Sequence, residues 1–420
     1  MSDAVDRARW DKLVAHISGL GALVWGDTGG TAAGGSAGPA AAPGPAGPPG
    51  SPPAVGDPAR AAVDAEGARY LLRFLAAGIR LCVEHDDTEA PAFCHSIEDR
   101  MSWGLDNPDC NYSYTRLAGD GTYRVSGTRG SARHLELQVN TGHFGDGDFA
   151  GWRAVSALTG DDLQCAPDGS FEVVLSAREH PGPWMRLDDG ASFLVVRQYF
   201  ADWERERPAD LAIERLDRPL PARPLDAATL AARLALLEQW LEVGARCWDS
   251  ISRGLLAGPP GPVTPFLPPA EASGLKGQAY GMGPWRCEPD EAVILHLDPP
   301  ACRMWGVSLC DRFWQSIDFG DRQSSLNSHQ AVPDADGGVT FVISHDDPGL
   351  ANWLDPGGHR EGTLAVRYLL AETVPTLDYR PVARAELDRA LPDGVAPITP
   401  EQRREVLARR HRAVAHRYRH

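Results

Sequence analysis

Side chains that can do chemistry gather in one stretch of the sequence, between residues 312 and 367. Ten of them are site candidates: Trp314, Gln315, Asn327, His329, Asp346, Asn352, Trp353, His359, Arg360 and Arg367. Aromatic walls with a few hydrogen-bonding groups are the usual lining of a small-molecule pocket. Histidine side chains ordinarily titrate near neutral pH, which makes His329 a candidate general base. We therefore predict His329 and Asp346 as catalytic residues and the other eight as ligand-binding residues.

Each candidate also has a structural interpretation. Asn and Asp beside Gly or Pro commonly close turns, and Trp314 and Trp353 would fit a core as readily as a ligand platform. His329 could instead ligate a metal together with His345 or His359. However, the sequence contains no HExxH, Walker or zinc-type Cys/His spacing. No metal site is therefore predicted, and any cofactor is unknown.

The charge balance and the apolar pattern exclude two classes of partner. With a formal net charge of -16, the chain lacks the excess of Lys and Arg that phosphate backbones require. No window reaches the ~18 apolar residues of a membrane span, and the first ten residues have no apolar signal-peptide region. The eight cysteines form no CxxC pair, which is typical of reduced thiols. We expect a cytoplasmic protein without nucleic-acid or membrane partners.

Helices are expected around the β-rich regions that carry the candidates. Apolar residues recur at spacings of three and four over 3–25 and 70–83, and again after Asp226, which should cap a connecting helix. Thr399 and Gln402 form a capping box at the start of a C-terminal helix. Seven Arg lie between Arg403 and Arg419. We interpret them as compensation of the helix dipole and as a solvated face.

Two β-rich regions look like copies of one unit. Three segments match in the same order: Asp168–Ser176 with Asp336–Ser344, Trp184 with Trp353, and 193–199 with 363–368. In each copy an Asp-Gly turn leads into a strand, a Trp-bearing loop follows, and a second strand ends in Val-Arg. Chance alternation is the alternative, but the ordered series favours duplication.

The sequence therefore predicts a mainly β protein with two tandem antiparallel β-sandwich units and with helices at the N-terminus, between the units and at the C-terminus. The expected parts are an N-terminal helix at 1–28, a flexible Gly/Pro/Ala insertion at 29–58, a helix with the first unit at 59–222, a connecting helix at 223–258, the second unit at 259–384 and a helical segment at 385–420.

Several of these segments also resemble a known family. Cys302–Cys310, Ser325–Asn327 and His345–Leu354 are similar to the actinobacterial branch of the uncharacterised family catalogued as domain of unknown function 1214. Asn107-Pro108-Asp109 fits the N-terminal region of the same proteins, so the resemblance covers about residues 66 to 370. It implies that the sandwich units are jelly-roll-like, and it implies no particular activity.

Two functions remain open at this point. The first is a small-molecule-binding protein, which could also be an enzyme, for a carbohydrate-like or oxygenated lipid-like metabolite. The second is a non-catalytic protein-interaction or self-association module, which could form a homo-oligomer. The first predicts that the candidates converge on one pocket, whereas the second predicts scattered candidates and an exposed apolar patch.

Overall fold

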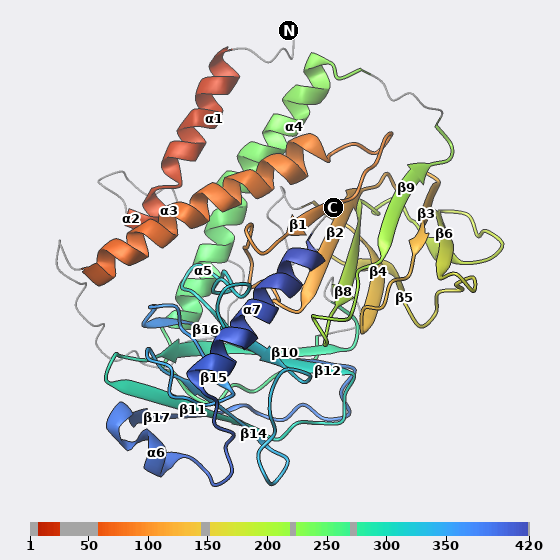
Figure 1. Ribbon diagram of the computed structural model, residues 1–420. Coiled ribbons are helices and arrows are strands. Elements are labelled where there is room, and N and C mark those ends of the chain that lie inside the picture. The colour runs from red at the N-terminus through yellow and green to blue at the C-terminus, as the bar shows by residue number, and fades with distance from the viewer. Residues whose placement is uncertain (1–6, 26–57, 144–151, 219–223, 269–274, 419–420) are drawn as a thin grey trace.

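The protein is described by a computed structural model that covers residues 7–25, 58–143, 152–218, 224–268 and 275–418. The expected insertion at 29–58 lies outside these residues except for Pro58. Two β-sandwich units and a layer of helices make up the described chain (Figure 1). The expected mainly β architecture, with helices at the N-terminus, in the middle and at the C-terminus, is confirmed.

The first unit packs a five-stranded sheet on a four-stranded sheet. The five-stranded sheet has the order β1 (Cys94–Ile97), β2 (Cys110–Arg116), β8 (Phe193–Tyr199), β4 (His134–Asn140) and β5 (Ala154–Thr159). The other sheet has the order β7 (Trp184–Arg186), β6 (Ser170–Ser176), β3 (Tyr123–Thr128) and β9 (Asp210–Arg215). Alternate residues of β4, such as Leu135 and Leu137, point into the core between them.

The second unit has two four-stranded sheets. One has the order β10 (Gln278–Arg286), β16 (Glu361–Leu369), β12 (Met304–Cys310) and β13 (Ser325–Asn327). The other has the order β15 (Trp353–Leu354), β14 (Val339–Ile343), β11 (Glu291–Leu297) and β17 (Asp378–Ala383). Their facing side chains form a continuous core that includes Leu295, Leu309 and Phe341.

The internal repeat is confirmed by the strand order. The order β2-β8-β4-β5 of the first unit corresponds to β10-β16-β12-β13 of the second, and β7-β6-β3-β9 corresponds to β15-β14-β11-β17. The Trp-bearing strands pair in parallel at equivalent places, Val174 with Trp184 and Val342 with Trp353. In each copy the indole Nε1 donates to the carbonyl of an equivalent serine, at 3.2 Å to Ser176 and 2.9 Å to Ser344.

The helices form a separate layer that packs on the first unit and, through α5 (Ala245–Leu256), also on β10 and β16 of the second unit (Figure 1). They are α1 (Arg7–Gly19), α2 (Ala22–Trp25), α3 (Pro58–Ile79) with the π-helical turn η1 (Arg80–Glu84), and α4 (Ala227–Gln239), which continues through η3 (Trp240–Gly244) into α5. Phe74 of α3 stacks on Trp240 with the ring centroids 4.1 Å apart. As expected, Asp226 caps α4 by accepting a hydrogen bond from the backbone of Thr229 at 2.7 Å.

The C-terminal segment contains η4 (Arg384–Glu386), α6 (Leu387–Ala390) and α7 (Pro400–Arg417), and α7 lies across the junction of the two units (Figure 1). The capping box of Thr399 and Gln402 is present. The expected solvated face is wrong for three arginines, because Arg403, Arg410 and Arg417 are buried. Their spacing of seven residues, about two helical turns, places them on one face. This face fastens α7 to both units.

Candidate functional site

A groove lies where the loop after β8, the loop after β13 and helix α7 meet, and its volume is about 420 Å³. Its polar lining consists of Asp202, Glu204, Gln323, His329, Gln330, Arg409 and Arg410. Its apolar lining includes Leu326, Val332, Ile398 and Val406. Both units and α7 therefore contribute to one concave surface of the size that holds small ligands.

His329 and Asp202 form the chemically distinctive pair of this groove. The His329 Nε2 atom lies 3.5 Å from Asp202 Oδ2, and the histidine side chain is half exposed. The other carboxylate oxygen, Oδ1, accepts hydrogen bonds from the backbone of Glu204 and Arg205, each at 3.1 Å. These bonds fix the carboxylate so that Oδ2 is left to orient the imidazole. An imidazole oriented by a carboxylate can take a proton from a hydroxyl group or a water molecule.

A buried aspartate positions both sides of the pair. The Asp109 Oδ1 atom accepts from Asn327 Nδ2 at 2.6 Å and from Trp203 Nε1 at 2.8 Å. The Asn327 Oδ1 atom in turn accepts from the backbone of His329 at 3.0 Å. Trp203 directly follows Asp202 in the chain. One carboxylate thus links the wall that carries Asp202 to the wall that carries His329.

Burial and basic neighbours shift the pKa of Asp109 in opposite directions. Burial raises its pKa, and the hydrogen bond from Asn327 and the charge of Arg417 offset part of that rise. The pKa of Arg410 shifts in the opposite direction. Burial lowers it to about 9, and the negative charge of Asp109 offsets part of that fall. The guanidinium of Arg410 stacks on Trp203 at 4.4 Å and donates to Ser325 Oγ at 2.5 Å. Asp109, Arg410 and Trp203 therefore interact with one another and with other buried protein groups.

The remaining charges of the groove also have partners. Arg409 lies 3.6 Å from Glu204 and 3.5 Å from Glu405. Asp202 faces His329. A ligand that carries a full charge would have to displace one of these partners, and the groove is thus suited to an uncharged molecule.

Asn327, Asn352 and Trp353 lie behind the groove wall. Asn352 accepts from the backbone of Val332 at 2.8 Å and donates to the Val332 carbonyl at 2.7 Å, which holds the wall in place. The Trp353 ring is buried under the guanidinium of Arg403, 5.2 Å away. Of the ten predicted residues, His329 lines the groove, and these three support it from the inside.

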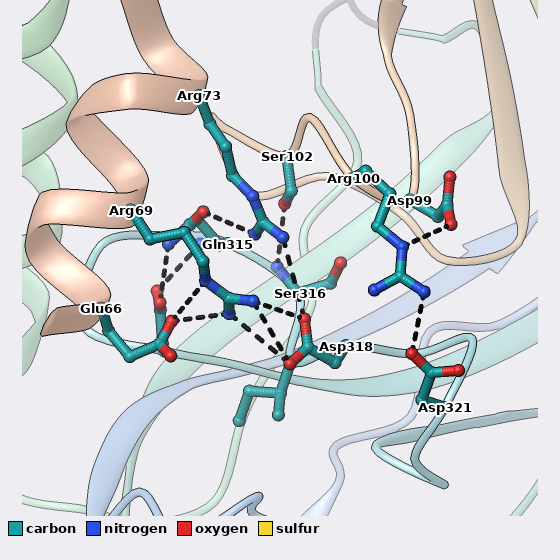
Figure 2. A network of polar contacts seen from close by, with 12 residues as sticks. Glu66, Arg69, Arg73, Asp99, Arg100, Ser102, Gln315, Ser316, Asp318 and Asp321 are labelled. Atoms are coloured by element: carbon teal, nitrogen blue, oxygen red, sulfur yellow. Dashed lines mark hydrogen bonds and ion pairs between the residues drawn. The ribbon is translucent and has the colours of Figure 1, made fainter. Parts of the chain in front are cut away.

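Three further candidates belong to a different cluster, between α3 and the loop 311–318. Gln315 donates to Asp311 at 2.9 Å and accepts from Arg73 at 3.0 Å. Figure 2 shows Arg73 and Arg69 reaching from α3 toward this loop, where Arg69 binds Asp318 at 3.2 Å. Trp314 follows Arg312 and Phe313 in the same loop and is buried with a positive φ of 61°.

The third of them, Arg367, anchors the neighbouring loop of the first unit. It donates to the carbonyl of Leu105 at 2.7 Å and to Ser308 Oγ at 3.2 Å. Beside it, the buried Asp106 accepts from the backbone of Ser316 at 2.8 Å. Burial raises the pKa of Asp106, and its serine partners offset part of that rise. These loops hold the two units together, and their carboxylates are occupied by internal hydrogen bonds.

The last three candidates lie apart from the groove lining. Asp346 is exposed in the turn after β14, where its carbonyl accepts from Ser344 Oγ at 2.8 Å. Arg360 is exposed and pairs with Glu288 at 3.1 Å. Burial raises the pKa of the Asp311 carboxyl, and the half-buried His359 lies close enough to offset part of that rise. The ten residues are therefore divided between the groove, the loop cluster and the surface.

Sequence reasoning missed the first-unit and C-terminal members of the groove. Asp202, Glu204 and Arg409 lie outside the stretch in which the candidates were sought. Asp109 offered a signal, because the Asn107-Pro108-Asp109 segment carries part of the family resemblance. Within the described residues there is no cluster of His, Cys, Asp and Glu that could hold a metal ion. Nor does any helix in those residues have the length and apolarity needed to span a membrane.

Comparison with known proteins places the chain among uncharacterised relatives. A family model described as protein of unknown function (DUF1214) matches residues 289–373. A crystal structure of a putative uncharacterized protein from Burkholderia cenocepacia is 30% identical, with a TM-score of 0.77, and the match covers 90% of this chain and 97% of that one. The VPA0106 protein from Vibrio parahaemolyticus is 11% identical, with a TM-score of 0.44 and coverage of 74% and 98%. No curated protein matches the chain.

Proposed function

The chain belongs to the DUF1214 family of unknown function, and from this premise we propose that it binds a small molecule in the groove beside His329. The observation that carries the proposal is the pairing of His329 with Asp202 in a concave site of about 420 Å³. The internal hydrogen bonds of Asp109, Asn327 and Asn352 support it, since they hold the walls of the groove before any ligand arrives.

The lining favours an uncharged, oxygenated ligand with an apolar part. His329, Gln330 and the paired charges at the rim offer hydrogen bonds to hydroxyl or carbonyl groups. Leu326, Val332, Ile398 and Val406 offer an apolar wall. Trp203 is buried between Arg410 and Arg417, with its ring centroid 4.4 and 4.3 Å from the two guanidinium carbons. Without an open aromatic platform, an oxygenated lipid-like metabolite suits the groove better than a carbohydrate.

If the protein is an enzyme, His329 is the proton acceptor and Asp202 is its partner. The carboxylate would stabilise the imidazolium that forms when His329 takes a proton from a ligand hydroxyl or from water. Asp202 thereby takes the role that the sequence pattern suggested for Asp346, which is exposed at a turn. Binding alone does not require this step.

A thermal-shift screen tests the binding proposal. We expect at least one compound from a library of hydroxylated and oxo-substituted fatty alcohols, fatty-acid esters and simple sugars to raise the melting temperature of the wild-type protein. The shift should be lost in His329→Ala and kept in the matched control His359→Ala, whose side chain lies outside the groove lining. A shift that survives in both His329→Ala and Asp202→Asn would refute the groove as the site.

The interaction module remains the second candidate because of a specific surface. Along α1 and α3, Trp10, Val14 and Leu72 expose 56%, 43% and 68% of their surface. Next to them is an apolar groove of about 340 Å³ lined by residues that include Ile17 and Leu75. Light scattering of the wild type and of Leu72→Glu tests self-association through this face. A larger mass for the wild type alone would favour this candidate.

We also propose that the protein is cytoplasmic and that its domains have the boundaries given above. We further propose that the two units are jelly-roll-like and that the chain belongs to the actinobacterial branch of the family. The composition supports the location, and the matching segments support the branch. Limited proteolysis tests the boundaries, since cleavage should concentrate within 29–58 and near 223 and 259.

A further inference from the structure

A row of buried polar side chains lies on one face of β4, at the centre of the five-stranded sheet. His134, Glu136, Gln138 and Asn140 alternate with the core residues of that strand and are each no more than 1% exposed. Glu136 pairs with Arg197 of β8 in the register of the sheet. In the second unit the equivalent pair is Gly306 and Arg367. The equivalent sheet of the second unit therefore forms with a glycine, Gly306, in place of the glutamate.

The carboxylate of Glu136 is poorly satisfied. Its side chain is fully buried, and neither oxygen accepts a well-formed hydrogen bond among the described residues, although the backbone N–H of Lys276 lies nearby. The Arg197 guanidinium lies 3.8 Å from Oε1, but it donates its hydrogen bond to Gln138 Oε1 at 2.9 Å. Arg367, the equivalent arginine, is satisfied by Ser308 and the Leu105 carbonyl instead. A charge buried without hydrogen bonds is costly, whereas a neutral carboxyl group costs much less.

The titratable groups near Glu136 come from three segments of the chain. Arg197 belongs to β8, His134 to β4 itself, and Lys276 to the segment before β10. The β5 residue opposite Glu136 is the uncharged Thr159. Burial raises the pKa of Glu136 to about 7, against the opposing effects of Arg197 and Lys276. His134 is held neutral, because burial and the nearby Arg303 lower its pKa to about 4.

This position borders a direct contact between the two units. Two residues beyond Arg197, the Tyr199 hydroxyl accepts from Gln278 Nε2 of β10 at 3.1 Å. Cys110 and Tyr199 of the first unit form one apolar cluster with Leu275, Met304 and Leu369 of the second. We call this contact the seam. A shift of Arg197 toward an ionised Glu136 would break its bond to Gln138 and disturb the packing beside Tyr199.

We propose that Glu136 is a proton-operated switch at the seam, and that its ionisation loosens the contact between the two units. The geometry carries this inference, because a buried carboxylate without hydrogen bonds can be relieved by binding a proton or by moving Arg197. The switch is independent of the groove and of its ligand.

Hydrogen exchange of the full-length protein tests the switch. After correction for the intrinsic rate, peptides from β4, β8 and β10 should exchange several-fold faster at pH 8 than at pH 6 in the wild type. In Glu136→Gln this ratio should fall to about one, because the amide keeps the shape of the neutral acid. The matched control Glu172→Gln, on the exposed face of β6, should keep the wild-type ratio. Equal ratios in the wild type and in Glu136→Gln would overturn the proposal.

A second measurement follows the proton itself. With ¹³C-labelled glutamate, one carboxyl resonance that is missing in Glu136→Gln should titrate near neutral pH. Titration of that resonance only in the ordinary acidic range of glutamate would overturn the proposal even if the exchange data showed a pH effect. Neutral titration without any change in exchange would also overturn it, since the seam would then not respond.

Discussion

Asp202 and His329 face each other at 3.5 Å across the junction of the two sandwich units, although 127 positions separate them in the chain (329 - 202 = 127). Neither unit alone contains the pair. The packing of the two copies thus forms the groove, and ligand pockets are often found at such boundaries between domains. Helix α7 closes this junction and contributes the third wall.

Removal of Asp109 should destabilise the protein strongly. Asp109→Ala removes the acceptor of the Trp203 indole and the shortest hydrogen bond of Asn327, and it leaves Arg410 without its buried countercharge. We expect a loss of about 3–5 kcal/mol in the free energy of unfolding. Urea denaturation measures it, with the exposed turn residue Asp346→Ala as the control. A loss below about 1 kcal/mol would contradict the central role given to this carboxylate.

The buried arginines of α7 should differ sharply from the exposed ones. Arg410→Ala removes the stacking on Trp203 and the bonds to Phe319 and Ser325, so we expect a cost of about 2–4 kcal/mol. Arg404, whose side chain is 73% exposed, pairs only with Glu401 on the same helix among the interactions described. Arg404→Ala should cost at most about 0.5 kcal/mol. Similar losses in thermal unfolding would show that α7 is not held by its buried face.

Glu136 should make the protein less stable as the pH rises toward neutrality. Its pKa is about 7 in the folded state against 4.5 for the free side chain, so the folded state binds the additional proton between these values. The stabilising contribution is complete below about pH 4.5 and is lost as the pH rises through 7, in total about 3 kcal/mol. Glu136→Gln should abolish this component of the pH dependence. Denaturation curves at pH 5, 6, 7 and 8 compare the two proteins.

Gly78 allows α3 to approach η3 closely. A Cβ atom at this position would lie 2.3 Å from Trp240 Cδ1, and the Trp240 indole is held by a 2.9 Å bond to the Phe74 carbonyl. Gly78→Ala should therefore destabilise by about 1–3 kcal/mol despite the higher helix propensity of alanine. Gly254, within α5, has open space at the same place. Gly254→Ala should instead stabilise by up to about 1 kcal/mol, and calorimetry distinguishes the two.

Local sequence patterns were sufficient to predict the main helices and strands and the internal repeat. The alternation of His134 to Val139 predicts a strand, Asp226 and Thr399 predict helix starts, and the equivalent Trp184 and Trp353 indicate the duplication. Each of these depends on residues that lie close together in the chain, or on the comparison of two local segments. The resemblance to the DUF1214 family likewise came from short contiguous segments.

The tertiary structure alone decided which polar residues meet. Asn352 and Trp353 are residue types that often bind ligands, yet they are buried behind the groove. Asp202 and Arg409 line it instead. Arg410 and Arg417 look like solvated charges in the sequence and become buried because α7 packs into the junction. Such contacts depend on how two folded units and a helix pack together, and local sequence patterns do not encode that packing.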